Sequence, residues 1–118
     1  MEKNIEVSLL LDFYGELLKP TGRHAVDLYY NDDLSLSEIA EDMGITRQGV
    51  RDSIKRCEQQ LFEYEKKLGL LSRFQQLEQG LEEISALAGQ IMRSTDDTQL
   101  RSLAAQIADK AGALKEKD

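Results

Sequence analysis

The stretch that decides the fold runs from Leu34 to Lys55 and reads LSLSEIAEDMGITRQGVRDSIK. Near its centre is Gly44, and glycine tolerates the positive φ that a tight turn between two helices requires. The apolar residues Met43 and Ile45 flank this glycine, and we expect both to pin the crossing of the two helices. The pattern predicts a helix-turn-helix.

The first helix of the motif carries its own start signal. Ser35 stands three residues before Glu38, the spacing of a capping box, which predicts a helix over residues 36–43. Ala40 supplies the small residue that is needed where the second helix crosses the first. Both features place the helix directly before the turn.

The second helix of the motif is predicted from Arg47 to about Lys67, with Thr46 as its amino-terminal cap. Apolar residues recur along it at alternating steps of four and three, which predicts one continuous apolar seam. These residues are Val50, Ile54, Cys57, Leu61, Tyr64 and Leu68. Gly69 then breaks or bends the helix.

Polar residues of this second helix are the candidate binding residues. With Val50 facing inward and roughly 100° per residue, Gln48, Arg51 and Lys55 fall on an outward face at the amino-terminal end. A recognition helix meets the major groove there, where Gln can read adenine, Arg can read guanine and Lys can take a phosphate. The predicted nucleic-acid-binding residues are Thr46, Arg47, Gln48, Arg51, Lys55 and Arg56.

Helical spacing continues on both sides of the motif, so the predicted fold class is all-α. Residues 5–18 form one helical pattern, which ends at residues 19–21 because the residue before a proline is pushed out of the α region. We expect Thr21 to cap a further helix over roughly residues 22–30.

The last third of the chain predicts two long helices joined by the polar turn of residues 94–97. Their apolar residues step by three and four, and they are Phe74, Leu77, Leu81, Ile84, Ala88 and Ile91, then Leu100, Leu103, Ile107, Ala111 and Leu114. We therefore expect a single all-α domain over residues 1–118, with a helix-turn-helix core over 1–68 and a helical extension over 69–118.

The composition of the chain indicates its class of protein and its cellular compartment. The 118 residues are 41% hydrophobic and 31% charged, which is ordinary for a soluble helical protein. No apolar run approaches the roughly 20 residues that span a bilayer, and no signal peptide is visible. The single cysteine, Cys57, cannot form an internal disulfide and fits a reducing compartment. We expect a cytoplasmic protein without membrane insertion.

The net charge of -7 is distributed unevenly. Residues 1–45 hold three Lys/Arg against ten Asp/Glu, and residues 74–118 hold five against eight. Residues 46–73 hold seven against four, so the only positive segment is the one that follows the turn.

Nothing in the sequence indicates an enzyme, so we expect no catalytic residue, cofactor or metal. His24 and Asp27 are two weak ligands, which do not make a metal site. Cys57 lies on the apolar seam, where a buried small hydrophobic side chain is the default interpretation. A glycine-rich phosphate loop and a nucleophile elbow are both missing from the sequence.

Three segments resemble the YlxM family (UPF0122) of small bacterial proteins: FYGELL, LYYNDDLSLSEIAEDMGITRQGVRDSIKRCE and FEYEKKLGL. The resemblance covers roughly residues 10–75, and its helix-turn-helix is also similar to region 4, the last DNA-binding region of bacterial sigma factors. It implies an all-helical, dimeric protein with a link to the signal recognition particle through gene neighbourhood. Gly49 and Arg51 depart from the family pattern, which has Ala and an aromatic residue there.

Two hypotheses follow. In the first, the chain is a DNA-binding regulator with its reading helix at residues 47–56, and the long helices form a homodimer. In the second, the helix-turn-helix is a scaffold and the chain is a protein-interaction module, whose surface is a helical groove or the acidic amino-terminal face. It then binds a signal recognition particle component, protein or RNA, or another targeting component, without binding DNA. The sign of the surface around residues 47–56 discriminates between them: a positive patch favours the first, whereas neutralisation by neighbouring acids such as Asp52, Glu58 and Asp42 favours the second.

Overall fold

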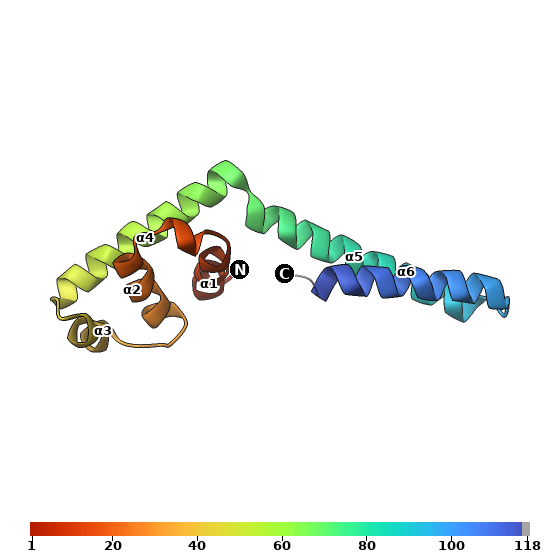
Figure 1. The fold of residues 1–118 in the computed structure, drawn as a ribbon, viewed down its shortest axis with the longest axis horizontal. Coiled ribbons are helices and arrows are strands. Elements are labelled where there is room, and N and C mark those ends of the chain that lie inside the picture. The colour runs from red at the N-terminus through yellow and green to blue at the C-terminus, as the bar shows by residue number, and fades with distance from the viewer. Residues whose placement is uncertain (117–118) are drawn as a thin grey trace. The chain divides into compact units, whose positions relative to one another are not determined.

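The computed structural model describes residues 1–116, and the helices among them confirm the all-α prediction (Figure 1). They are α1 (Lys3–Tyr14), the short 3-10 helix η1 (Gly15–Leu17), α2 (Pro20–Tyr30), α3 (Leu36–Met43), α4 (Arg47–Leu68), α5 (Leu70–Ser94) and α6 (Thr98–Glu116). The chain divides into two compact units, residues 1–71 and 72–118. The single domain over 1–118 stays a prediction.

The turn between α3 and α4 is built as the sequence predicts. Ser35 Oγ accepts a hydrogen bond from Glu38 N–H at 3.1 Å, and Glu38 Oε1 accepts one from Ser35 N–H at 3.0 Å, so the capping box is present. Gly44 has a φ of 68°, the left-handed conformation that glycine adopts without strain. Thr46 Oγ1 accepts from Gly49 N–H at 3.0 Å and caps α4.

One expectation about a helix end is wrong, and the two residues that flank the turn are buried to different extents. Thr21 does not cap α2, because that helix begins one residue earlier, at Pro20. Proline suits the first helical position, since its missing N–H would have no partner inside the helix. Ile45 lies beside Gly49 in the first turn of α4 but is 44% exposed, whereas Met43 on the other side of the turn packs against the core.

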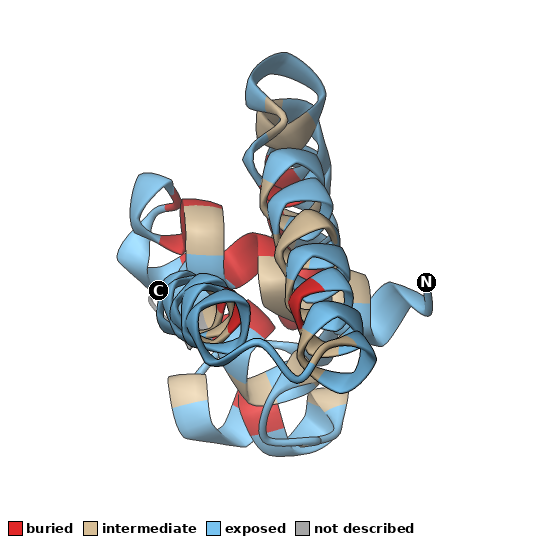
Figure 2. Cartoon of the chain, turned by 90° about the vertical axis from the view of Figure 1, so that its right-hand side faces the viewer, coloured by how far each residue is buried: buried red, intermediate tan, exposed pale blue. Residues whose placement is uncertain are grey.

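The core of residues 1–71 forms around α4, which contacts α1, α2 and α3. Most of the predicted apolar seam is buried, whereas Tyr64 is half-buried and Leu68 lies mainly at the surface. The largest side chains that are fully buried are Tyr14, Leu10, Ile39, Leu61, Val7, Val26 and Val50. Buried residues, red in Figure 2, are few relative to the exposed ones.

Tyr14 ties α1 to the connection between α4 and α5. Its hydroxyl donates to Glu65 Oε1 at 2.7 Å and accepts from Leu70 N–H at 3.0 Å. Glu65 Oε1 also accepts from Leu71 N–H at 3.0 Å, so the first amides of α5 have partners after the turn at Gly69. Burial and the neighbouring Glu65 raise the pKa of Tyr14.

Residues 72–116 form a hairpin of α5 and α6. Asp97 Oδ1 accepts from the N–H groups of Gln99 and Leu100 at 2.8 and 3.1 Å and begins α6, as the polar turn predicts. Lys115 pairs with Glu82 across the hairpin at 2.5 Å. The buried apolar residues of this hairpin are alanines, namely Ala88, Ala104 and Ala111.

Gly22 allows α2 to approach α4 closely. A Cβ at this position would lie 2.5 Å from Sγ of Cys57, which is buried as the sequence predicts. Burial also raises the pKa of the Cys57 thiol. The sulfur therefore fills the space that a side chain at position 22 would need.

We expect Gly22→Ala to lower the free energy of unfolding by about 1–3 kcal/mol, because overpacking at the α2–α4 contact forces the helices apart. In a Cys57→Ala background the same change should be close to neutral. Urea denaturation of the four proteins of this double-mutant cycle measures the coupling. An equal loss of stability in both backgrounds would contradict the close approach.

Candidate nucleic-acid interface

The amino-terminal half of α4 presents the predicted reading residues at the surface. Val50 and Ile54 are 0% and 4% exposed, so this side of the helix faces the core. The exposed residues of the same turns are Arg47, Gln48, Arg51, Asp52, Lys55 and Arg56. Thr46 is also exposed, but its hydroxyl is used by the helix cap. The role of all these residues as nucleic-acid contacts stays a prediction.

Gln48 and Asp52 interact with one another on this surface. Gln48 Nε2 donates to Asp52 Oδ1 at 2.9 Å, one helical turn apart. An amide nitrogen has two hydrogens, so Gln48 keeps a second donor that Asp52 does not engage. Asp52, which the sequence suggested only as a source of repulsion, thus restrains the side chain of a predicted reading residue.

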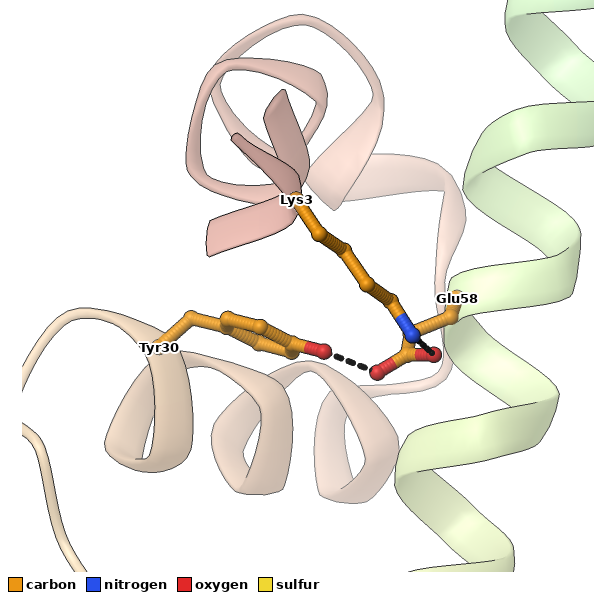
Figure 3. A network of polar contacts seen from close by, with 3 residues as sticks. All are labelled: Lys3, Tyr30 and Glu58. Carbon is orange, nitrogen blue, oxygen red and sulfur yellow. Dashed lines mark hydrogen bonds and ion pairs between the residues drawn. The ribbon is translucent and has the colours of Figure 1, made fainter. Parts of the chain in front are cut away.

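Arg51 and Lys55 face a hollow of about 350 Å³ beside α4. Glu58 lies in this hollow and has two partners, which Figure 3 shows. Lys3 Nζ of α1 lies 3.2 Å from Glu58 Oε2, and the Tyr30 hydroxyl of α2 donates to Glu58 Oε1. Burial, followed by the hydrogen bond to Glu58, raises the pKa of Tyr30.

Sequence reasoning missed Lys3, Tyr29 and Tyr30 as neighbours of the reading face. All three line the same hollow as Arg51 and Lys55. Lys3 lies 55 positions from Glu58 in the sequence, so no local spacing connects them. The only signal in the sequence was their chemistry, a cation near the start of α1 and paired tyrosines at the end of α2.

His24 and Asp27, the two residues considered as metal ligands, are not paired with each other. His24 Nε2 lies 3.2 Å from Asp42 Oδ2 rather than on Asp27, and both side chains are more than half exposed. Within residues 1–116, we find no group of three or more His, Cys, Asp or Glu that could hold a metal ion. None of the helices described combines the length and apolar character needed to cross a membrane.

Comparison with known proteins shows the family of this chain. The sequence model of the family UPF0122, described as "Putative helix-turn-helix protein, YlxM / p13 like", matches residues 1–111. The chain belongs to the UPF0122 family. The resemblance to YlxM proteins is therefore confirmed, and the match reaches past residue 75 into α6. The family match thus spans the whole of the first unit of this UPF0122 protein and reaches residue 111 of the second.

Relatives of this UPF0122 protein are similar over most of its length. A UPF0122 protein of Desulforamulus reducens is 48% identical over 84 residues, which are 71% of this chain and 72% of the relative. One of Clostridium kluyveri is 52% identical over 79 residues, covering 67% and 71%. One of Listeria welshimeri is 47% identical over 85 residues, covering 72% and 77%.

Proposed function

We propose that this UPF0122 protein is a DNA-binding regulator whose recognition helix is the amino-terminal half of α4, residues 47–56. The observation that carries the proposal is the set of exposed Arg, Lys and Gln side chains that follows a left-handed glycine turn. A helix-turn-helix places this part of its second helix in the major groove. The family description names the same motif.

The charge distribution determines how DNA binding depends on distance and on salt concentration. The acidic residues outside 46–73 repel a duplex at long range, whereas the positive segment attracts it at close range. Salt screens both effects, and each phosphate contact releases counterions, so binding should weaken steeply as salt rises. Phosphate contacts by Arg51, Lys55 and Arg56 would supply most of this dependence.

We also infer that the chain is a homodimer joined through the α5–α6 hairpin. Large apolar side chains of this hairpin are between 44% and 59% exposed: Leu77, Ile84, Leu87, Ile91, Leu100, Leu103, Ile107 and Leu114. At roughly 100° per residue these side chains and the buried alanines cover a band about 100° wide on each helix. Such a band is wider than the narrow seam through which a helix packs against a single partner in a coiled coil, and its large side chains stay about half exposed within the hairpin.

A second hairpin of the same kind is the simplest cover for this band. Two hairpins complete a four-helix bundle, in which each helix packs against two neighbours and hides the wider band. A symmetric dimer would also give the protein two recognition helices, as in helix-turn-helix proteins that bind paired half-sites. The dimer therefore fits the DNA-binding role.

The association with the signal recognition particle rests on the family resemblance. The acidic amino-terminal part of the chain, with ten Asp/Glu against three Lys/Arg in residues 1–45, is the surface that would attract a basic protein partner. In that alternative the chain binds a targeting component and has no affinity for DNA. A direct measurement of duplex binding separates the two functions.

We expect Arg51→Ala/Lys55→Ala to weaken binding to a random-sequence DNA duplex and to reduce the salt slope of log K by about 0.9 for each phosphate that the variant no longer neutralises. The matched control, Lys66→Ala/Lys67→Ala, removes the same charge from the exposed carboxyl end of α4. Fluorescence anisotropy over a salt series measures both proteins, and circular dichroism checks their folding. Absence of binding by the unaltered protein, or equal effects of the two variants, would reject α4 as the reader.

Sedimentation equilibrium should return twice the 13.4 kDa mass of the chain at micromolar concentration. Ile84→Ser/Ile107→Ser should shift the protein to the single-chain mass, because it removes apolar area from the proposed interface. The control Glu83→Ser/Gln106→Ser changes exposed polar positions of the same helices and should leave the dimer intact. A single-chain mass for the unaltered protein would contradict the dimer.

A further inference from the structure

The hollow beside α4 gathers side chains from four helices. Lys3 comes from α1, Tyr29 and Tyr30 from α2, Leu36 from α3, and the rest from α4. Its lining residues are Lys3, Tyr29, Tyr30, Leu36, Arg51, Ile54, Lys55 and Glu58, around a volume of about 350 Å³. Three cations and two phenol hydroxyl groups therefore meet a single carboxylate.

That carboxylate is already engaged. Glu58 is held by Lys3 at 3.2 Å and by the Tyr30 hydroxyl, and its side chain is only 13% exposed. Within residues 1–116, Arg51 and Lys55 form no ion pair, although both are exposed. The hollow therefore carries two uncompensated positive charges on the side of α4 that adjoins its reading residues.

Lys3 is the cation of this hollow that can change partner. Its side chain is 63% exposed, so its ammonium group remains in contact with water while it pairs with Glu58. The lysine end of the pair is open to water, so a duplex phosphate can reach the ammonium group and compete with Glu58 for it. Glu58 would keep the Tyr30 hydroxyl as a partner when Lys3 moves away.

We propose that this hollow receives a backbone phosphate of the duplex beside the recognition helix, and that Lys3 leaves Glu58 to bind it together with Arg51 and Lys55. The proposal rests on the DNA-binding role of α4. It adds Lys3 of α1 to the residues that contact DNA. In the absence of DNA, Glu58 is the anion that pairs with Lys3 and competes with the phosphate for it.

A duplex phosphate fits the position of the hollow better than a small free anion does. The major groove is about 12 Å wide, so a helix that enters it has a phosphate backbone along each flank. Arg51 and Lys55 belong both to the proposed reading residues and to the hollow, which places the hollow on such a flank. The amino end of α3 adds little attraction, because the Glu38 carboxylate already occupies it.

Two substitutions should act in opposite directions on DNA binding. Lys3→Gln should weaken binding to a random-sequence duplex about fivefold and reduce the salt slope by about 0.9, because the variant has one charge-assisted phosphate interaction fewer. Glu58→Gln keeps an acceptor for Tyr30 but releases Lys3, so it should strengthen binding by about two- to fivefold. Anisotropy titrations over a salt series measure both.

Matched controls separate the effect of a lost phosphate contact from the effect of a change in net charge. Lys19→Gln and Glu63→Gln make the same charge changes at exposed positions outside the hollow, and each should have a smaller effect than its partner substitution. If Lys3→Gln and Glu58→Gln shift binding in the same direction, or neither exceeds its control, the Lys3–Glu58 pair only supports the fold and the phosphate assignment fails. If the unaltered protein binds no duplex at all, it is the proposed function that fails.

Inorganic phosphate distinguishes a duplex site from a site for a free anion. Titration at constant ionic strength, followed by the NMR signals of the Lys3 and Arg51 backbone amides, should show no saturation at low millimolar concentration. Saturable binding that Lys3→Gln abolishes, combined with an unchanged salt slope for DNA, would overturn the assignment to the duplex.

Discussion

Val50, Ile54, Cys57 and Leu61 occupy one side of α4 and are buried where that helix meets α1, α2 and α3. The three preceding helices are short, so they are stable mainly through what they pack against. Because α4 is common to all of these contacts, a change in its rotation about its own axis would disturb the whole core. The close approach of Gly22 to Cys57 shows how little space this packing leaves.

The same burial determines which residues of α4 are available to a partner. When one side of a helix is fixed against a core, its opposite side has a fixed orientation, and here it carries Gln48, Arg51 and Lys55. The Thr46 cap and the Gly44 turn set where that surface begins. A rigid reading surface needs this kind of support, because loosely held side chains cannot keep a register on DNA.

The sequence predicted features that depend on local spacing and missed features that depend on distant packing. The capping box at Ser35 and Glu38 could be predicted because it lies within one turn. The exposure of Ile45 could not, because it depends on where α4 lies relative to α3. The contact of Lys3 with Glu58 could not be predicted either, because only the packing of α1 on α4 brings the two residues together.

The most direct test of α4 as the reading helix is a ¹⁵N–¹H NMR titration of the full chain with a short random-sequence duplex at low salt. If α4 reads DNA, the backbone amide signals of residues 46–56 should shift most, and their shifts should fade together as salt is added. Shifts concentrated in α5 and α6, or no shift at any duplex concentration, would contradict the claim that this protein reads DNA through α4.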